Sequence, residues 1–323
     1  MQQCLQKLVN EKRSDILAWL ERKKQGLETP IYSSFDIRNN GTKASIVDSN
    51  LFPAGFNNLT QDSRKQAALY FKEFIPTICH HKSILVIPEA HTRNLYYLSN
   101  LHAIHDILTD AGYHTTLGSI REDIEETLEV VDAEGHALVL EKMKNVGGKL
   151  HTKSFKGGLI LLNNDFSTRE PPLLESVKEC IAPPLQLGWL HRRKISFFKH
   201  FCRLLDEFGE EFDFDHWLLC PKTKAVDDID FTSGKNIDLV AKTADEMIAF
   251  IQKKYDEYKI TEKPYVFVKD NSGTYGMGIL SVHSGQELLD LNSKERRSMK
   301  SGKERNPINS VIVQEGISTK YKV

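Results

Sequence analysis

Residues 266–282 read Val266-Phe-Val-Lys-Asp-Asn-Ser-Gly-Thr-Tyr-Gly-Met-Gly-Ile-Leu-Ser-Val282 and carry the strongest structural pattern in the chain. Two runs rich in β-branched residues flank a loop that holds Gly273, Gly276 and Gly278, which predicts a strand, a glycine loop and a second strand. The spacing G-x-x-G-x-G differs from the dinucleotide fingerprint G-x-G-x-x-G, and the chain contains no G-x-x-x-x-G-K-S/T motif. Rossmann and Walker-type nucleotide sites are therefore excluded.

Lys269 lies on the first of these strands, before the loop. A glycine hairpin can close over a phosphate, because backbone N–H groups approach the oxygens where no Cβ intervenes. An ammonium group on the incoming strand would add positive charge beneath the phosphate. In protein kinases the lysine follows the glycine loop instead, which argues against that family. The alternative is an ordinary glycine-rich turn with an exposed lysine.

Strands and helices alternate through the first half of the chain, which predicts an α/β fold with a βαβ layer. Expected helices cover 5–27, 62–75, 96–111, 195–208 and 244–258, and expected strands cover 31–37, 44–47, 84–87, 113–117, 159–162, 265–269, 279–282 and 311–314. Residues 127–131 and 137–141 predict a surface hairpin. Paired prolines at 171–172 and 183–184 place a domain boundary near residue 180. We therefore expect an N-terminal substrate domain over 1–180 and a nucleotide-binding domain over 181–323.

Composition limits the classes of partner. The 323 residues include 43 Lys and Arg against 44 Asp and Glu, so no global field favours nucleic acid or an anionic membrane. No apolar run approaches the roughly 20 residues of a membrane-spanning helix. The five cysteines are scattered without paired spacing, which is typical of free thiols. We expect a soluble, cytoplasmic protein that binds neither nucleic acid nor membrane.

A second motif follows the glycine hairpin. Residues 310–316 read Ser310-Val-Ile-Val-Gln-Glu-Gly316, an apolar strand that ends in an amide and a carboxylate able to reach a nucleoside. Together with Lys269 and its loop, this strand resembles the ATP-grasp superfamily. Those ligases hold ATP between a lysine-bearing strand with a glycine-rich loop and a later hinge strand.

Longer motifs narrow the resemblance to the proteobacterial, Acidithiobacillus-type glutamate–cysteine ligase family. The motifs are Ser34-Phe-Asp-Ile-Arg-Asn-Asn-Gly-Thr-Lys-Ala-Ser-Ile-Val-Asp-Ser-Asn-Leu-Phe-Pro-Ala-Gly-Phe-Asn-Asn-Leu59, Ile87-Pro-Glu-Ala-His-Thr-Arg-Asn94, Trp189-Leu-His-Arg-Arg-Lys194 and Val268-Lys-Asp-Asn-Ser-Gly-Thr-Tyr-Gly-Met-Gly-Ile279. The resemblance implies an ATP-dependent and Mg²⁺-dependent ligase that joins L-glutamate to L-cysteine through a glutamyl acyl phosphate, the first step of glutathione synthesis. Charge neutralisation and positioning dominate such phosphoryl transfer.

The resemblance also implies site residues. The phosphates are assigned to Lys269, Ser272, Gly273, Thr274, Tyr275, Gly276 and Gly278, and the nucleoside to Gln314 and Glu315. Arg192 and Arg193 are assigned to catalysis together with Lys269. They stand at the start of a predicted helix, where the macrodipole disfavours cations, so an anionic partner is expected. The alternative is a solvated face.

Amino-acid substrates need a different set. Arg38 and Arg93 stand beside asparagines at strand ends, where a guanidinium fork can bind a carboxylate. The remaining candidates for substrate binding are polar and lie in the same motifs: Asp48, Asn50, Asn57, Asn58 and Asn94. Local turn chemistry is the alternative for the asparagines. His91 and His191 are interpreted as structural rather than as proton shuttles.

Members of the family run further than Val323, and that part is expected to carry the Mg²⁺ ligands, which leaves the metal residues unassigned. We therefore expect an incomplete ATP-grasp domain after the N-terminal domain. Asp227, Asp228 and Asp230 are interpreted as the start of a helix or as part of a surface loop. The alternatives are a fragment of a full ligase, a non-catalytic truncated protein that binds amino acid or nucleotide, and another ATP-grasp carboxylate–amine ligase.

Overall fold

The computed structural model describes residues 2–90, 93–167, 169–273, 278–300 and 307–319. The chain divides into two compact units: unit 1 holds residues 1–28, 35–49 and 192–323, and unit 2 holds residues 29–34 and 50–191. This division differs from the expected boundary near residue 180. The segment after the first proline pair stays with unit 2, because residues 181–182 form a strand paired with that unit's sheet.

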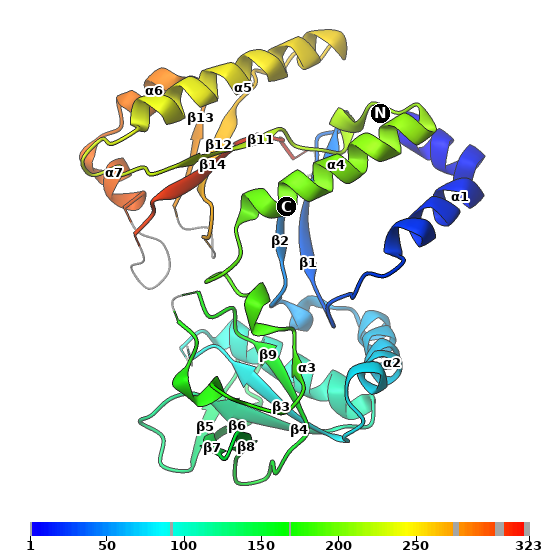
Figure 1. Cartoon of the computed structure of the whole chain (residues 1–323), viewed down its shortest axis with the longest axis vertical. Coiled ribbons are helices and arrows are strands. Elements are labelled where there is room, and N and C mark those ends of the chain that lie inside the picture. Colours follow the sequence, from blue (N-terminus) through cyan, green and yellow to red (C-terminus); the bar gives the residue numbers. More distant parts are fainter. Residues whose placement is uncertain (1, 91–92, 168, 274–277, 301–306, 320–323) are drawn as a thin grey trace. The chain divides into compact units, whose positions relative to one another are not determined.

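Unit 2 is built on a six-stranded sheet in the order β10-β9-β3-β4-β6-β5, with only β5 antiparallel (Figure 1). Its strands are β3 (Ser83–Pro88), β4 (His114–Ser119), β5 (Thr127–Val131), β6 (Ala137–Lys142), β9 (Leu159–Asn163) and β10 (Ile181–Ala182), and a small hairpin adds β7 (Lys144–Val146) and β8 (Lys149–His151). The predicted α/β fold and its βαβ layer are confirmed, since α3 (Leu95–Asp110) connects the parallel pair β3 and β4. The hairpin of β5 and β6 is also confirmed.

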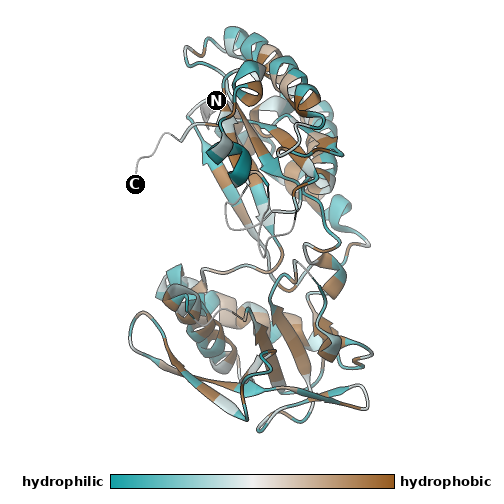
Figure 2. Cartoon of the chain, turned by 90° about the vertical axis from the view of Figure 1, so that its left-hand side faces the viewer, coloured by the Kyte–Doolittle hydropathy of each residue, from teal (hydrophilic) through white to brown (hydrophobic). Residues whose placement is uncertain are grey.

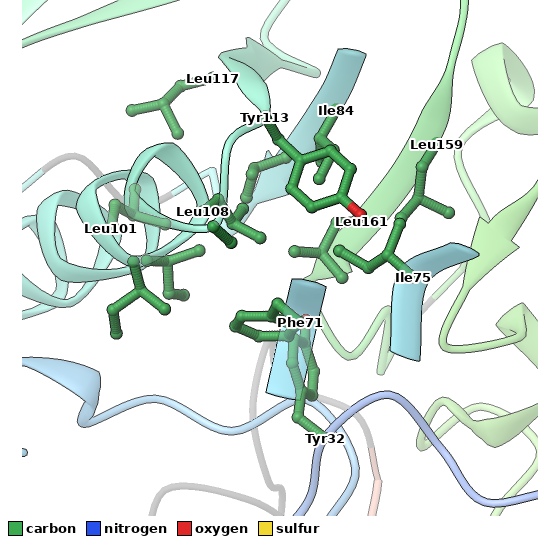
Figure 3. Packing of buried hydrophobic residues seen from close by; sticks show 14 of the residues in the cluster. Tyr32, Phe71, Ile75, Ile84, Leu101, Leu108, Tyr113, Leu117, Leu159 and Leu161 are labelled. Atoms are coloured by element: carbon green, nitrogen blue, oxygen red, sulfur yellow. The ribbon is translucent and has the colours of Figure 1, made fainter. Parts of the chain in front are cut away.

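The core of unit 2 follows from its apolar strands. Every residue of β9 is buried, and so are five of the six in β3, as expected for strands covered on both faces. Strands of this sheet are brown, the hydrophobic colour, over much of their length in Figure 2. Phe71 and Ile75 of α2 (Gln61–Ile78) pack with Leu101 and Leu108 of α3 against this sheet (Figure 3).

Unit 1 contains an antiparallel sheet in the order β11-β14-β12-β13. Its strands are β11 (Thr223–Asp227), β12 (Val266–Asp270), β13 (Ile279–Val282) and β14 (Ser310–Glu315). Val266 and Val268 are buried in the core between this sheet and α5 (Ile237–Glu257). Figure 1 shows α5 lying along the sheet. Because side chains alternate along a strand, Phe267 and Lys269 face the other side of the sheet.

The rest of unit 1 comprises a hairpin and further helices. The hairpin is β1 (Ser34–Asn39) with β2 (Ala44–Asn50), and the helices are α1 (Gln2–Lys24), α4 (Lys194–Phe212), α6 (Gly285–Leu289) and α7 (Ser293–Ser298). Short 3₁₀ turns lie at His216–Leu218 in unit 1 and at Phe56–Asn58, Pro172–Leu174 and Leu185–Leu187 in unit 2. Trp19 of α1 packs edge-on against Phe208 of α4. Within the described part of the chain, no helix has the length and apolar character that a membrane crossing requires.

The expectation that all five cysteines are free thiols is wrong for two of them. Cys202 and Cys220 form a disulfide with their Cα atoms 5.5 Å apart, although their separation of 18 residues gave no recognisable motif. The two meet because α4 turns back through the His216–Leu218 segment to β11. Cys79 and Cys180 are free thiols.

Candidate functional site

A cavity of about 280 Å³ lies in unit 1 on the sheet face that carries Lys269. Residues from the hairpin, α4, the sheet and the chain after β14 line it: Asp36, Arg38, Val47, Asp48, Lys194, Phe267, Lys269, Asp270, Gly273, Ile279 and Ile317. Three cations and three carboxylates are therefore gathered around one hollow. Arg38, Asp48 and Lys269, which belong to separate sequence motifs, meet here.

Lys269 is the most distinctive of these cations. Its side chain is almost fully buried, and Nζ donates to Gln314 Oε1 at 2.8 Å and to the Val47 carbonyl at 3.3 Å. Burial lowers the pKa of Lys269 to about 8, although the nearby Asp48 carboxylate opposes this effect. Among the described residues, no carboxylate lies within ion-pair distance of this ammonium. A buried ammonium without a carboxylate partner is a strong site for an anionic ligand.

Lys194, Arg38 and Asp270, which also line the cavity, have partners within the protein. Lys194 Nζ lies 2.6 Å from Asp48 Oδ1, and Arg38 donates to Thr319 Oγ1 at 2.9 Å. Asp270 Oδ1 accepts hydrogen bonds from the N–H and the hydroxyl of Ser272 at 3.0 and 3.2 Å. Arg38 is exposed to solvent, so among the described cations of the cavity Lys269 is the buried one that has no carboxylate within ion-pair distance.

The glycine hairpin closes at its base. The Asp270 N–H donates to the Gly278 carbonyl at 3.0 Å, and Gly278 takes a φ of 63°, which favours glycine. The N–H groups of Ser272 and Gly273 both donate to Asp270, so these two groups are used within the turn. The predicted phosphate contacts at Thr274, Tyr275 and Gly276 lie outside the described residues.

Asn271 connects the hairpin to α4. Its carbonyl accepts from Lys194 N–H at 2.7 Å and its Oδ1 accepts from Ile195 N–H at 3.0 Å, which satisfies donors in the first turn of the helix. The Asn271 amide also donates to Ser310 Oγ at 2.9 Å. The base of the glycine hairpin, α4 and β14 are thus joined through one buried side chain.

The two predicted arginines precede α4. Arg192 Nη2 donates to the Ser49 carbonyl at 3.3 Å and to the Ser49 hydroxyl, and burial lowers the pKa of Arg192. Arg193 is exposed and donates to the Arg192 carbonyl at 2.7 Å. Arg192 therefore holds the end of β2, beside Asp48. Neither arginine lines the cavity.

β14, called the hinge strand below, ends beside the cavity. Gln314 uses its side-chain oxygen to hold Lys269, and its Nε2 donates to Thr223 Oγ1 at 3.3 Å. Glu315 is buried and forms an ion pair with Lys43. Neither side chain lines the cavity, whereas Ile317 does. The cavity is therefore lined by the chain just after the hinge strand and not by the side chains of Gln314 and Glu315.

The remaining predicted residues belong to unit 2 and make local contacts there. Asn50 Oδ1 accepts from Phe52 N–H at 2.9 Å, and Asn94 Oδ1 accepts from Tyr97 N–H at 3.2 Å as the N-cap of α3. Asn57 and Asn58 lie in the 3₁₀ turn before α2. Arg93 is exposed in the turn that precedes α3, and His191 Nε2 lies 3.0 Å from Glu170. His91 lies outside the described residues.

Several residues of the site carried no interpretable signal in the sequence. Lys43 follows Asn-Gly-Thr in a turn and resembles an exposed lysine, yet it is 1% exposed. Asn271 and Lys194 stood within motifs but gave no sign of contacting each other. The contact between Asn271 and Lys194 becomes recognisable only when α4 and the glycine hairpin are placed side by side in unit 1. For Asp36 the sequence offered one signal: it lies two residues before Arg38, so the two side chains share a face of β1.

Comparisons with known proteins agree with one another. A family model described as GshA, glutamate-cysteine ligase, matches residues 6–323. A crystal structure of a candidate gamma-glutamylcysteine synthetase from Methylobacillus flagellatus KT is 37% identical to this chain, with a TM-score of 0.88. The similarity covers 98% of this chain and 75% of that chain. The comparison with curated proteins gave no match.

Proposed function

This chain belongs to the glutamate–cysteine ligase family, a family of ATP-dependent ligases, and we propose that its unit 1 cavity binds the triphosphate of ATP against Lys269. The predicted glutamate–cysteine ligase family is thereby confirmed, whereas its proteobacterial, Acidithiobacillus-type subdivision stays a prediction. The observation that carries the proposal is the buried ammonium of Lys269, which meets amide and carbonyl oxygens but no carboxylate within ion-pair distance among the described residues. A polyphosphate supplies the missing negative charge.

The proposed reaction joins L-glutamate to L-cysteine in two steps. The γ-carboxylate oxygen of glutamate attacks the γ-phosphorus of ATP, the bond to the β-phosphate oxygen breaks, and ADP leaves. The cysteine amine then attacks the acyl carbon, phosphate leaves with the bonding electron pair, and the nitrogen loses a proton. Lys269 stabilises negative charge on the transferring phosphoryl group in the first step. No side-chain nucleophile is needed.

The polar rim of the cavity suits an amino-acid substrate. Arg38 offers a planar guanidinium to a carboxylate, and Asp36 and Asp48 offer carboxylates to an ammonium group. In this proposal Arg192 acts on Asp48 through the Ser49 backbone and does not touch the phosphates. For Arg93, Asn50, Asn57, Asn58 and Asn94 substrate binding stays a prediction.

The resemblance implies Mg²⁺ together with ATP. Within the described ranges, His, Cys, Asp and Glu side chains do not group in threes as a metal site. The metal residues therefore stay unassigned, and no step is routed through Mg²⁺. Mg²⁺ enters the assays as the usual companion of ATP phosphates.

Hydroxylamine trapping tests the phosphoryl role of Lys269. The chain is mixed with ATP, Mg²⁺, L-glutamate and hydroxylamine, and glutamyl hydroxamate is measured by mass spectrometry. Lys269→Ala is expected to lower hydroxamate formation by at least about a hundredfold, because the positive charge that stabilises the transferring phosphoryl group is lost. Lys235→Ala is the control, since that exposed lysine of unit 1 lies on a different turn, paired with Asp228. Undiminished hydroxamate in Lys269→Ala, or none in the unmodified chain, contradicts the proposal.

A further inference from the structure

A buried ion pair lies at the end of the hinge strand, and the proposed chemistry does not use it. Lys43, just before β2, has Nζ 2.8 Å from Glu315 Oε2 and 2.8 Å from the Cys220 carbonyl oxygen. The same ammonium lies 4.2 Å from the centroid of the Trp217 ring. Lys43 and Glu315 are each about 1% exposed. The ammonium is thus held from three directions.

The partner carboxylate is held through one oxygen, Oε2, whereas its buried Oε1 has no hydrogen-bond partner among the described residues. Glu315 Oε2 also accepts from the Lys222 N–H at 3.0 Å, and the Glu315 N–H donates to the Lys222 carbonyl at 2.8 Å. One residue further, the Gly316 N–H donates to the Tyr265 carbonyl at 2.9 Å. A side chain at residue 316 would meet the Tyr265 ring, since a Cβ there would lie 2.3 Å from it. The backbone is therefore fixed on both sides where the chain leaves the hinge strand.

A buried ion pair is weak evidence for stability. Removing two charges from water is costly, and replacement of both partners by uncharged groups is often neutral or stabilising. A pair of this kind is better explained by the geometry that it fixes. Here that geometry is the path of residues 315–317, and Ile317 lines the cavity.

The register gives the backbone positions around the cavity. Lys269 pairs with Ile312, whereas Glu315 pairs with Val266, three residues further along the hinge strand. The Lys269 side chain reaches along the sheet, so its ammonium meets Gln314 Oε1 at 2.8 Å, one residue before Glu315. Phosphates held by this ammonium would lie next to the end of the hinge strand and would leave the nucleoside beside residues 315–317, of which Ile317 lines the cavity.

We propose that Lys43 is a positioning residue for the nucleoside: by binding Glu315 it fixes the backbone of residues 315–317 that contacts base and ribose. This inference rests on the proposed function, because it requires the phosphates to lie against Lys269. Lys43 touches neither nucleotide nor substrate in this arrangement and acts only through Glu315. Its loss should weaken recognition of the nucleoside and leave recognition of the phosphates unchanged.

A crossed binding experiment tests the proposal. Adenosine, inorganic tripolyphosphate and ATP each compete with a fluorescent ATP analogue for the full chain and three variants. The variants are Lys43→Met/Glu315→Gln, which leaves no unpaired charge, Lys269→Ala, and Val240→Ala. Val240 is a fully buried residue of α5 and controls for general destabilisation.

The expected result is opposite for the two site variants. Lys43→Met/Glu315→Gln should weaken adenosine and ATP by about tenfold, as expected for one or two misplaced hydrogen bonds, with little change for tripolyphosphate. Lys269→Ala should weaken ATP and tripolyphosphate but not adenosine. Val240→Ala should lower the melting temperature and change none of the three affinities. Should the double variant not fold, Glu315→Gln alone keeps an oxygen for Lys43 and should show the same pattern, more weakly.

Two outcomes overturn the inference. Unchanged adenosine affinity in a folded double variant would mean that the pair is merely structural. An equal loss for all three ligands would mean that Lys43 supports the whole cavity rather than its nucleoside end. Failure of the proposed function looks different, because tripolyphosphate would then bind Lys269→Ala as well as it binds the unmodified chain. Absence of ATP binding by the unmodified chain would reject both.

Discussion

Two buried lysines of unit 1 show how partners decide the role of a charge. Lys43 and Lys269 are both nearly excluded from water, and burial lowers the pKa of each to about 8. Lys43 has a carboxylate at 2.8 Å, whereas Lys269 has an amide oxygen at 2.8 Å and a carbonyl at 3.3 Å. The desolvation cost of Lys43 is offset within the protein. That of Lys269 is offset only in part, and in the proposed function an anionic ligand completes it.

The affinity for ATP is expected to fall as the pH rises above about 8. Unbound Lys269 loses its proton there, because its pKa is about 8, while a bound polyphosphate raises this pKa. Binding then takes up a proton, so Kd should increase toward about tenfold per pH unit. Phosphate ester ionisation, with a pKa of about 6, is complete below this range. Calorimetric titration in two buffers of different ionisation enthalpy measures both the Kd and the proton uptake.

Two variants show whether Lys269 or Lys43 is the group whose titration causes this pH dependence of the ATP affinity. Lys269→Arg stays charged across the range and should give a flat, weaker affinity. Lys43→Met/Glu315→Gln removes the other lysine whose pKa lies near 8 and should retain the slope. The other charges facing Lys269 are Asp36, Arg38, Asp48 and Lys194. A flat profile in the unmodified chain would contradict the phosphoryl role of Lys269.

At the scale of elements, the glycine hairpin is coupled to α4 and the hinge strand by Asn271. Its backbone and side-chain oxygens accept the Lys194 and Ile195 N–H groups, and its amide reaches Ser310. Buried polar groups that lose one partner cost more than the bond itself contributes. The side chain therefore sets where the loop begins relative to Lys269, two residues earlier.

Asn271→Ala is expected to lower the free energy of unfolding by about 1–2 kcal/mol, the usual cost of a lost helix cap. It should also weaken tripolyphosphate binding severalfold, because the base of the glycine hairpin is no longer held against α4 and the hinge strand. Asn292→Ala is the matched control, since Asn292 caps α7 and does not line the cavity. Chemical denaturation and ligand competition measure the two effects. Equal phosphate affinity in both variants would show that Asn271 acts only as a cap.

The sequence predicted those elements whose apolar pattern is strong. β13 has the expected bounds of 279–282, and β3, β9 and β14 extend the expected strands by one or two residues. β11 was missed because a short edge strand with one buried side chain, Val226, has no periodic signal. α5 begins at Ile237, before the predicted 244, because Asn236 and the turn at Gly234 precede it.

The candidate site was predicted only in part, for a physical reason. Lys269, Arg38 and Asp48 were recognised as chemical groups in motifs, and the structure brings them to one cavity. Lys43 and Asn271 act through contacts between segments 272 and 39 residues apart, and single-sequence patterns do not reveal such contacts. The cysteine pair escaped for the same reason.

At the scale of the whole molecule, the chain forms two units with separate hydrophobic cores. A core of unit 2 gathers the β3, β4 and β9 strands with α2 and α3, and a core of unit 1 gathers α5 with the sheet that carries Lys269. Unit 1 takes residues 35–49 from the N-terminal third, so its cavity is completed by a hairpin far from it in sequence. Multidomain chains of this kind commonly unfold in more than one cooperative step.

ATP is therefore expected to stabilise unit 1 alone. A ligand that binds one native unit at about 100 times its Kd adds about 2.7 kcal/mol to the unfolding free energy of that unit. Amides of β12 and β14 should exchange about a hundredfold more slowly with ATP, whereas those of β3 and β9 should keep their rates, because their core binds no nucleotide in this proposal. Hydrogen exchange with mass spectrometry, with Lys269→Ala as the control that abolishes the effect, measures both sets at once. Equal slowing of β3 and β9 would mean that the two cores unfold as one cooperative body, and the stabilisation by ATP would then belong to the chain as a whole.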